Sequence, residues 1–188
     1  MRPNLSALLC AAALACLAPS ALAAERSSER GIDACALLLD DEVRSAVGRD
    51  IHRGERHDAG EFEWGDKPAK LSYSSTCLWR IGFGEEASPD PGSSLADTSF
   101  VMVNAIRWSA GSEGAKHYLQ SFKEAAEDSV IDQAPNPLDI AEEALWWGDG
   151  VALRKGGTSV GVSVHLPGER QKERALEEYL AKIIASRL

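Results

Sequence analysis

The chain has 188 residues, with 20 basic and 29 acidic side chains and a formal net charge of −9 at neutral pH. A surface with this charge repels phosphate backbones and anionic lipid headgroups, which argues against nucleic acid as a partner. The part that follows the N-terminal segment, about 165 residues, has the length of one domain with one core.

Residues 1–24 have the pattern of a cleavable signal peptide. Arg2 provides a positive charge, an apolar stretch runs from Leu5 to Leu17, and Ala21-Leu22-Ala23 places small residues where a signal peptidase requires them. A retained membrane anchor needs about 20 apolar residues, and this shorter stretch is interrupted by Pro19. We therefore expect cleavage after Ala23 or one residue later, and a periplasmic or secreted protein.

Lipid anchoring at Cys16 is a weaker alternative. This cysteine follows the apolar stretch, but Ala13 stands where lipoprotein signals usually carry a larger aliphatic residue. Signal cleavage removes Arg2 and no acidic residue, so the mature chain has a formal net charge of −10. No later segment is long and apolar enough to cross a bilayer.

The cysteines give a second argument about the compartment. Cys10 and Cys16 leave with the signal peptide, so Cys35 and Cys77 remain as a pair. In an oxidising compartment we expect them to form a disulfide, worth roughly 4 kcal/mol in the loop-entropy model. Two buried free thiols are the alternative, and two cysteines alone lack the ligands for a metal site.

Alternation and capping residues predict the elements of the first half. Residues 25–31 are polar and should form a flexible tail. Helical segments are expected from Asp33 and over 41–47, the second with Asp40 as N-cap and Gly48 as its end. Residues 49–71 predict one or two short edge strands, and 72–83 a clearer strand.

The second half gives stronger signals. Residues 100–108 are apolar on both faces and predict a central strand, and Ser112 should cap a helix that runs to about residue 128. Pro135 and Pro137 enforce an extended connection. Further strands are expected over 144–147, 151–155 and 158–165, with a Gly156-Gly157 hairpin, before a final helix over 169–187.

The order predicts a single exported domain, residues 25–188, of the α+β class: an antiparallel β-sheet flanked by two or three helices, with one disulfide.

Several of these segments resemble a group of secreted bacterial domains of unknown function that is best known among actinobacterial lipoproteins. The similarity lies in Cys35-Ala36-Leu37-Leu38, in Cys77-Leu78-Trp79 and in the glycine-rich hairpin that ends at Val164. The resemblance implies a Cys35–Cys77 disulfide and a compact α/β domain, which in some relatives carries a lipid. It implies no catalytic residue.

Histidine and tryptophan supply the candidate site residues. His52 and His57 lie in an acidic stretch that ends near Glu63, a composition that suits zinc or copper, although their spacing matches no standard metal motif. Five tryptophans lie on or beside expected strands, where they would fill the core. The rings of Trp146 and Trp147 should lie on opposite strand faces, and an outward ring beside Trp64 would mark a binding patch.

No nucleophile elbow, phosphate loop or facing carboxylate pair is present in the sequence. We therefore expect a monomeric, non-enzymatic module that binds an envelope protein or a small ligand and needs no cofactor. The alternative is a metal-dependent or hydrolytic periplasmic enzyme that uses the His52–Glu63 segment.

Overall fold

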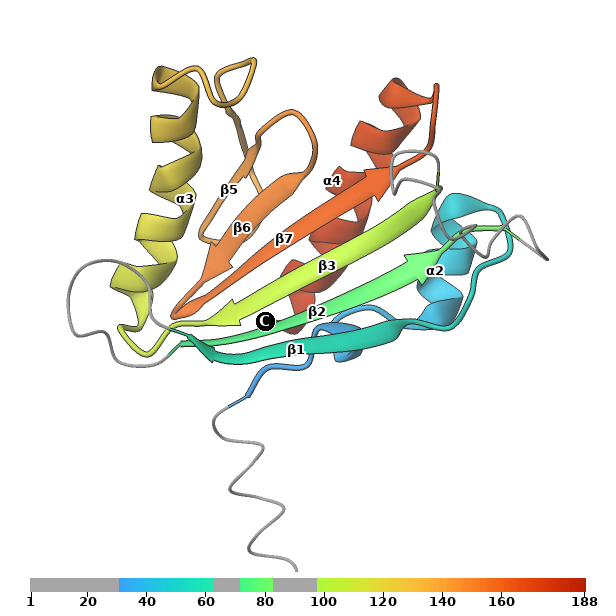
Figure 1. Ribbon diagram of the computed structural model, residues 1–188, viewed down its shortest axis with the longest axis horizontal. Coiled ribbons are helices and arrows are strands. Elements are labelled where there is room, and N and C mark those ends of the chain that lie inside the picture. Colours follow the sequence, from blue (N-terminus) through green and yellow to red (C-terminus); the bar gives the residue numbers. More distant parts are fainter. Residues whose placement is uncertain (1–30, 63–71, 83–97) are drawn as a thin grey trace, which may run out of the picture.

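The computed structural model describes residues 31–62, 72–82 and 98–188, and its strands form one seven-stranded antiparallel sheet (Figure 1). The strands are β1 (Glu55–Phe62), β2 (Ser72–Arg80), β3 (Phe100–Arg107), β4 (Asn136–Leu138), β5 (Glu143–Trp146), β6 (Val151–Lys155) and β7 (Thr158–His165). The helices are the short 3₁₀ helix η1 (Ala34–Ala36) and the α-helices α2 (Asp40–Val47), α3 (Ser112–Glu127) and α4 (Arg170–Arg187). The expected α+β class is confirmed.

The sheet consists of two consecutive meanders. Strands β1 to β3 follow one another in space, as do β4 to β7, and the meanders join where β3 pairs with β7. The predicted hairpin at Gly156-Gly157 connects β6 to β7, and Gly156 adopts a positive φ of 56° there. The sheet order is therefore β1-β2-β3-β7-β6-β5-β4.

The main core lies on the face of the sheet covered by η1, α2 and α4 (Figure 1). Alternate residues of β3 and β7 point to this face because side chains alternate along a strand. The register places Val103 opposite Val162, and both side chains are fully buried. From the helices, Val43 of α2 and Leu180 of α4 reach the same core. None of the helices in the described ranges combines the length and hydrophobicity of a bilayer-spanning segment.

Two glutamates on the buried side of α4 complete the hydrogen bonding of β7. Beyond the end of its pairing with β6, the backbone N–H of Val164 donates to Glu177 at 3.1 Å, and that of Leu166 donates to Glu173 at 2.6 Å. The indole Nε1 of Trp146 also donates to Glu177, at 2.8 Å. Burial raises the pKa of Glu177. The carboxylates thus take the place of strand partners.

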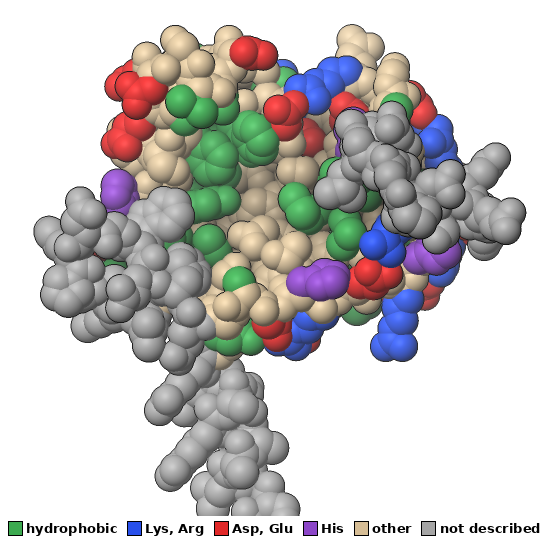
Figure 2. Space-filling view, viewed as in Figure 1, with side chains coloured by type: hydrophobic (Ala, Val, Ile, Leu, Met, Phe, Trp, Pro, Cys, Tyr) green, Lys and Arg blue, Asp and Glu red, His purple; other side chains and the backbone are tan. Residues whose placement is uncertain are grey.

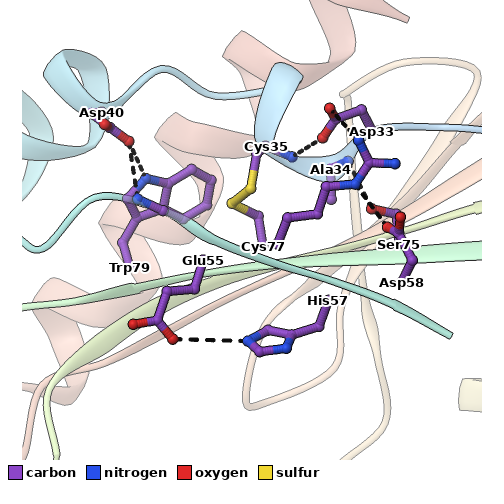
Figure 3. Close-up of a disulfide and its surroundings, with 12 residues drawn as sticks. Asp33, Ala34, Cys35, Asp40, Glu55, His57, Asp58, Ser75, Cys77 and Trp79 are labelled. Atoms are coloured by element: carbon purple, nitrogen blue, oxygen red, sulfur yellow. Dashed lines mark hydrogen bonds and ion pairs between the residues drawn. A yellow bond between two sulfur atoms is a disulfide. The ribbon is translucent and has the colours of Figure 1, made fainter.

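The predicted disulfide is confirmed: Cys35 of η1 is bonded to Cys77 of β2, with 5.1 Å between the Cα atoms (Figure 3). Beside it, the fully buried Trp79 donates from Nε1 to the Asp40 carboxylate at 2.8 Å, and the backbone N–H of Gly54 donates to the same oxygen at 3.2 Å. These bonds fasten the N-terminal segment to the sheet.

The same bonds change the expected start of α2. Asp40 is the first residue of the helix and Leu39 is its N-cap, so the prediction of Asp40 as N-cap is wrong. The reason is that the Asp40 carboxylate accepts from Trp79 and Gly54 instead of from its own helix, and the indole hydrogen bond lowers its pKa. Likewise, Ser112 lies inside α3, because Gly111 at a φ of 65° provides the N-cap.

Both edges of the sheet resist pairing with another chain. The β1 edge carries charged side chains, and its register shifts between Asp58 and Gly60. At the opposite edge, β4 has only three residues and contains Pro137, which cannot donate a backbone hydrogen bond. Short, charged, bulged or proline-containing edges are how sheets avoid adding strands.

Candidate functional site

The described helices cover the second face of the sheet only in part. The helix α3 lies on this side and packs on β6 and β7, whereas β1, β2 and much of β3 carry no helix from the described ranges there (Figure 1). We call this side of β1, β2, β3 and the adjoining part of β7, which the described helices leave bare, the open face. Figure 2 shows it as a shallow hollow, largely of polar side chains and backbone, between apolar groups on two sides.

Strand register places four chemically useful residues in one row across the open face. His57 of β1 lies opposite Thr76 of β2, Thr76 opposite Asn104 of β3, and Asn104 opposite Gly161 of β7. Directly opposite residues of neighbouring strands have Cα atoms about 5 Å apart. The row therefore brings together residues from sequence positions as far apart as 57 and 161.

Three polar groups at the centre of the open face lack a complete set of partners. The Asn104 amide donates to Ser74 at 3.2 Å and to Thr76 at 2.8 Å, which uses both of its hydrogens and leaves its carbonyl oxygen to accept. The hydroxyls of Tyr118 and Ser163 form no hydrogen bond within the described part of the chain. No fully buried side-chain N or O atom of the described residues lacks a partner, so these hydroxyls reach the surface.

Tyr118 extends from α3 over the row. Its hydroxyl lies 3.3 Å from the position that a Cβ atom would take on Gly161. Only a residue without a side chain leaves that hydroxyl in place without displacement. Burial raises the pKa of Tyr118 to about 12, so it stays protonated at neutral pH and can both donate and accept.

Tyr118 belongs to a line of four aromatic side chains beside α3. We call this line the aromatic row: Trp108, Tyr118, Phe122 and Trp147. Successive ring centroids are 6.1, 5.3 and 5.5 Å apart. Trp108 is buried and donates from Nε1 to Ser159 at 2.7 Å, whereas the other three rings are half-buried. The aromatic row thus forms an apolar wall beside the open face.

A pocket of about 170 Å³ opens at the rim of the sheet, where Trp147 ends the aromatic row. Besides Trp147, this rim pocket is lined by Val130, Ile131, Asp132, Gln133, Gly148, Asp149 and Arg170. The Arg170 guanidinium is already engaged, since it pairs with the Asp149 carboxylate and donates to the Gly148 carbonyl. Arg170 therefore holds the turn in place, and the ring of Trp147 is the link from the pocket to the aromatic row.

The structure places the predicted tryptophans differently. Trp146 is buried on the core face, donates to Glu177 and lies under the Arg174 guanidinium at 4.3 Å, so it does not line the rim pocket. Trp147 lies on the opposite face, as adjacency in a strand predicts, and lines the pocket. Trp64 lies outside the described residues. A binding role for these residues remains a prediction.

The two histidines of the metal hypothesis do not converge. His57 lies on the open face with its Nε2 3.8 Å from Glu55 (Figure 3), whereas His52 precedes β1 and donates its backbone N–H to Arg80. In the described residues no three histidine, cysteine, aspartate or glutamate side chains come together as a metal site.

Comparisons with protein-family models, curated proteins and solved structures find no match for this chain. The resemblance to secreted lipoprotein-like domains therefore stays a prediction, and the candidate site rests on the geometry alone.

Sequence reasoning missed the central groups of this site. Asn104 lies within an apolar strand and Tyr118 within an amphipathic helix, where neither stands out. One signal was present: the alternation of β7 assigns Gly161 and Ser163 to the wetter face, and a glycine within a strand often marks a close approach.

Proposed function

We propose that this chain is an exported, non-enzymatic binding module that takes its ligand on the open face, beside the aromatic row. The observation that carries the proposal is the set of three incompletely bonded polar groups, from Asn104, Tyr118 and Ser163, on a hollowed and half-buried surface. Ligand sites characteristically combine apolar walls with a few convergent polar groups.

The predicted export and the sheet edges also support a binding function on a face of the sheet. The signal-peptide pattern of residues 1–24 predicts a periplasmic or secreted protein, and the disulfide suits an oxidising compartment. Both sheet edges resist strand addition, so a face of the sheet is the more suitable surface for recognition than an edge.

The test is a two-dimensional ¹H–¹⁵N NMR screen of the mature protein against a library of small neutral and charged molecules. We expect the compounds that bind to shift amide signals of β2, β3 and β7 on the open face. A Ser163→Arg variant, which places a long charged side chain there, should abolish those shifts. The matched Ser186→Arg variant on exposed α4 should bind like the wild type. Ligands that bind Ser163→Arg as well as the wild type, or shifts confined to other surfaces, would contradict the proposal.

Native mass spectrometry tests the metal-dependent alternative. We expect the purified mature protein to carry no stoichiometric metal. A bound metal that disappears in a His52→Ala, His57→Ala double variant would favour the enzyme hypothesis instead.

A further inference from the structure

Building on the proposed function, we infer that the ligand of the open face is a neutral saccharide. Its ring would lie over Asn104, beside the Tyr118 hydroxyl that already covers Gly161, with its C–H face towards the aromatic row. The inference follows from the charge, the hydrogen-bonding capacity and the size of the surface, and each of these properties excludes a different class of ligand.

The charge of the central groups argues against ionic ligands. The arginines on this side of the sheet are already paired: Arg80 donates to Glu55 at 2.7 Å, and Arg154 donates to Glu142 and Glu143 at 2.8 and 2.9 Å. These pairs engage the two arginines. Around Asn104 and Ser163 the described groups are hydroxyls, an amide, a glycine and the apolar Met102 and Leu78, none of which carries a charge, whereas His57 and Glu55 lie on the edge strand β1.

Hydrogen-bonding capacity excludes a purely apolar ligand. Such a ligand would bury the hydroxyls of Tyr118 and Ser163 and the carbonyl oxygen of Asn104 without giving them partners, which is unfavourable. Two hydroxyls can each donate and accept, and the amide oxygen can accept. The complementary ligand therefore carries several groups that both donate and accept, as sugar hydroxyls do.

Size and shape favour a single small ring. Asn104 and Gly161 are direct neighbours across β3 and β7, and Ser163 lies two residues farther along β7, about 6.6–6.8 Å away. Tyr118 reaches over Gly161 from α3. The three polar groups thus span roughly the width of one monosaccharide. The half-buried rings of Phe122 and Trp147 supply an apolar surface on which the C–H face of a sugar can pack.

The test titrates ¹⁵N-labelled mature protein with glucose, N-acetylglucosamine, cellobiose and chitobiose. Cyclohexanol, acetate and methylammonium serve as probes that lack either the hydroxyl set or the neutral charge. We expect saturable shifts at the amides of Asn104, Gly161 and Ser163 with at least one of the sugars. Cyclohexanol, acetate and methylammonium should produce no saturable shift there.

Two hydroxyl deletions with matched controls make the test specific. Tyr118→Phe and Ser163→Ala should each weaken sugar binding by about 3- to 10-fold, the value of one hydrogen bond. The same changes at exposed positions of α4, Tyr179→Phe and Ser186→Ala, should leave it unchanged. If Tyr118→Phe fails to fold, the sugar affinity of Ser163→Ala still tests the inference.

The outcomes separate this inference from the proposed function. If none of the sugars shifts the open face but other molecules do, the saccharide assignment is overturned and the binding function stands. If sugars bind elsewhere on the protein, or if both deletions bind sugar as well as the wild type, the assignment is overturned as well. If no compound of any class shifts the open face, the proposed function itself fails.

Discussion

Reduction of the Cys35–Cys77 bond should remove a large share of the stability of this domain. The bond closes a loop with a sequence separation of 42, and the loop-entropy model assigns roughly 4 kcal/mol to a cross-link of that length. For a domain of this size, 1 kcal/mol corresponds to about 2–4 °C in melting temperature. We therefore expect reduction to lower the midpoint by roughly 8–16 °C.

The measurement is thermal unfolding followed by circular dichroism, with and without a phosphine reductant, combined with thiol titration under denaturing conditions. Without reductant, the mature protein should show no free thiol. A Cys35→Ala, Cys77→Ala double variant is the control, since its melting temperature should not respond to reductant. Because Cys77 is fully buried, its replacement by alanine also destabilises the variant by leaving a cavity. The comparison of oxidised with reduced wild-type protein is therefore the cleaner one. An unchanged midpoint on reduction, or two titratable thiols, would refute the reasoning.

Three further predictions concern other parts of the chain. Burial raises the pKa of Glu177, so its contribution to stability is full below its unfolded pKa of about 4.3 and is lost as pH rises through the higher folded value. The unfolding free energy of the wild type minus that of Glu177→Gln should therefore fall over this window in urea titrations, and a difference that stays constant with pH would contradict the prediction. Gly54→Ala should cost about 1–3 kcal/mol in urea unfolding, because the added methyl would lie 2.6 Å from the Trp79 indole nitrogen, and an unchanged midpoint would contradict that overlap. N-terminal sequencing of the exported protein should begin one or two residues after Ala23, and an intact N-terminus would refute cleavage.

Periodicity predicted the parts of the fold that depend on local sequence. The alternation of β7 and the glycines before it gave a hairpin that the structure contains, and the apolar β3 is central because it pairs on both sides. The three-residue β4 was expected only as an extended connection. Pro137 argues against a strand locally, yet it can pair with Leu145 at an edge.

Tertiary contacts decided what the sequence could not indicate. Glu173 and Glu177 are one helical turn apart and resemble a solvated helix face, but they are buried because β7 extends beyond β6 and leaves N–H groups to satisfy. In the same way, the row from His57 to Gly161 depends on the register of four strands. Register is a property of the assembled sheet, so no window of sequence contains it.

The junction between the two meanders lies on the open face, so a ligand bound there would affect how the two halves of the sheet hold together. Pairings within each meander are local in sequence, whereas β3 and β7 are separated by α3 and three strands and must close the longest loop of the sheet. Asn104 and Gly161 face each other across that junction. A molecule bound there would clamp the two halves of the domain together. Its binding energy would then oppose global unfolding rather than local loosening, so occupancy could be followed as a shift in the melting temperature of the whole protein.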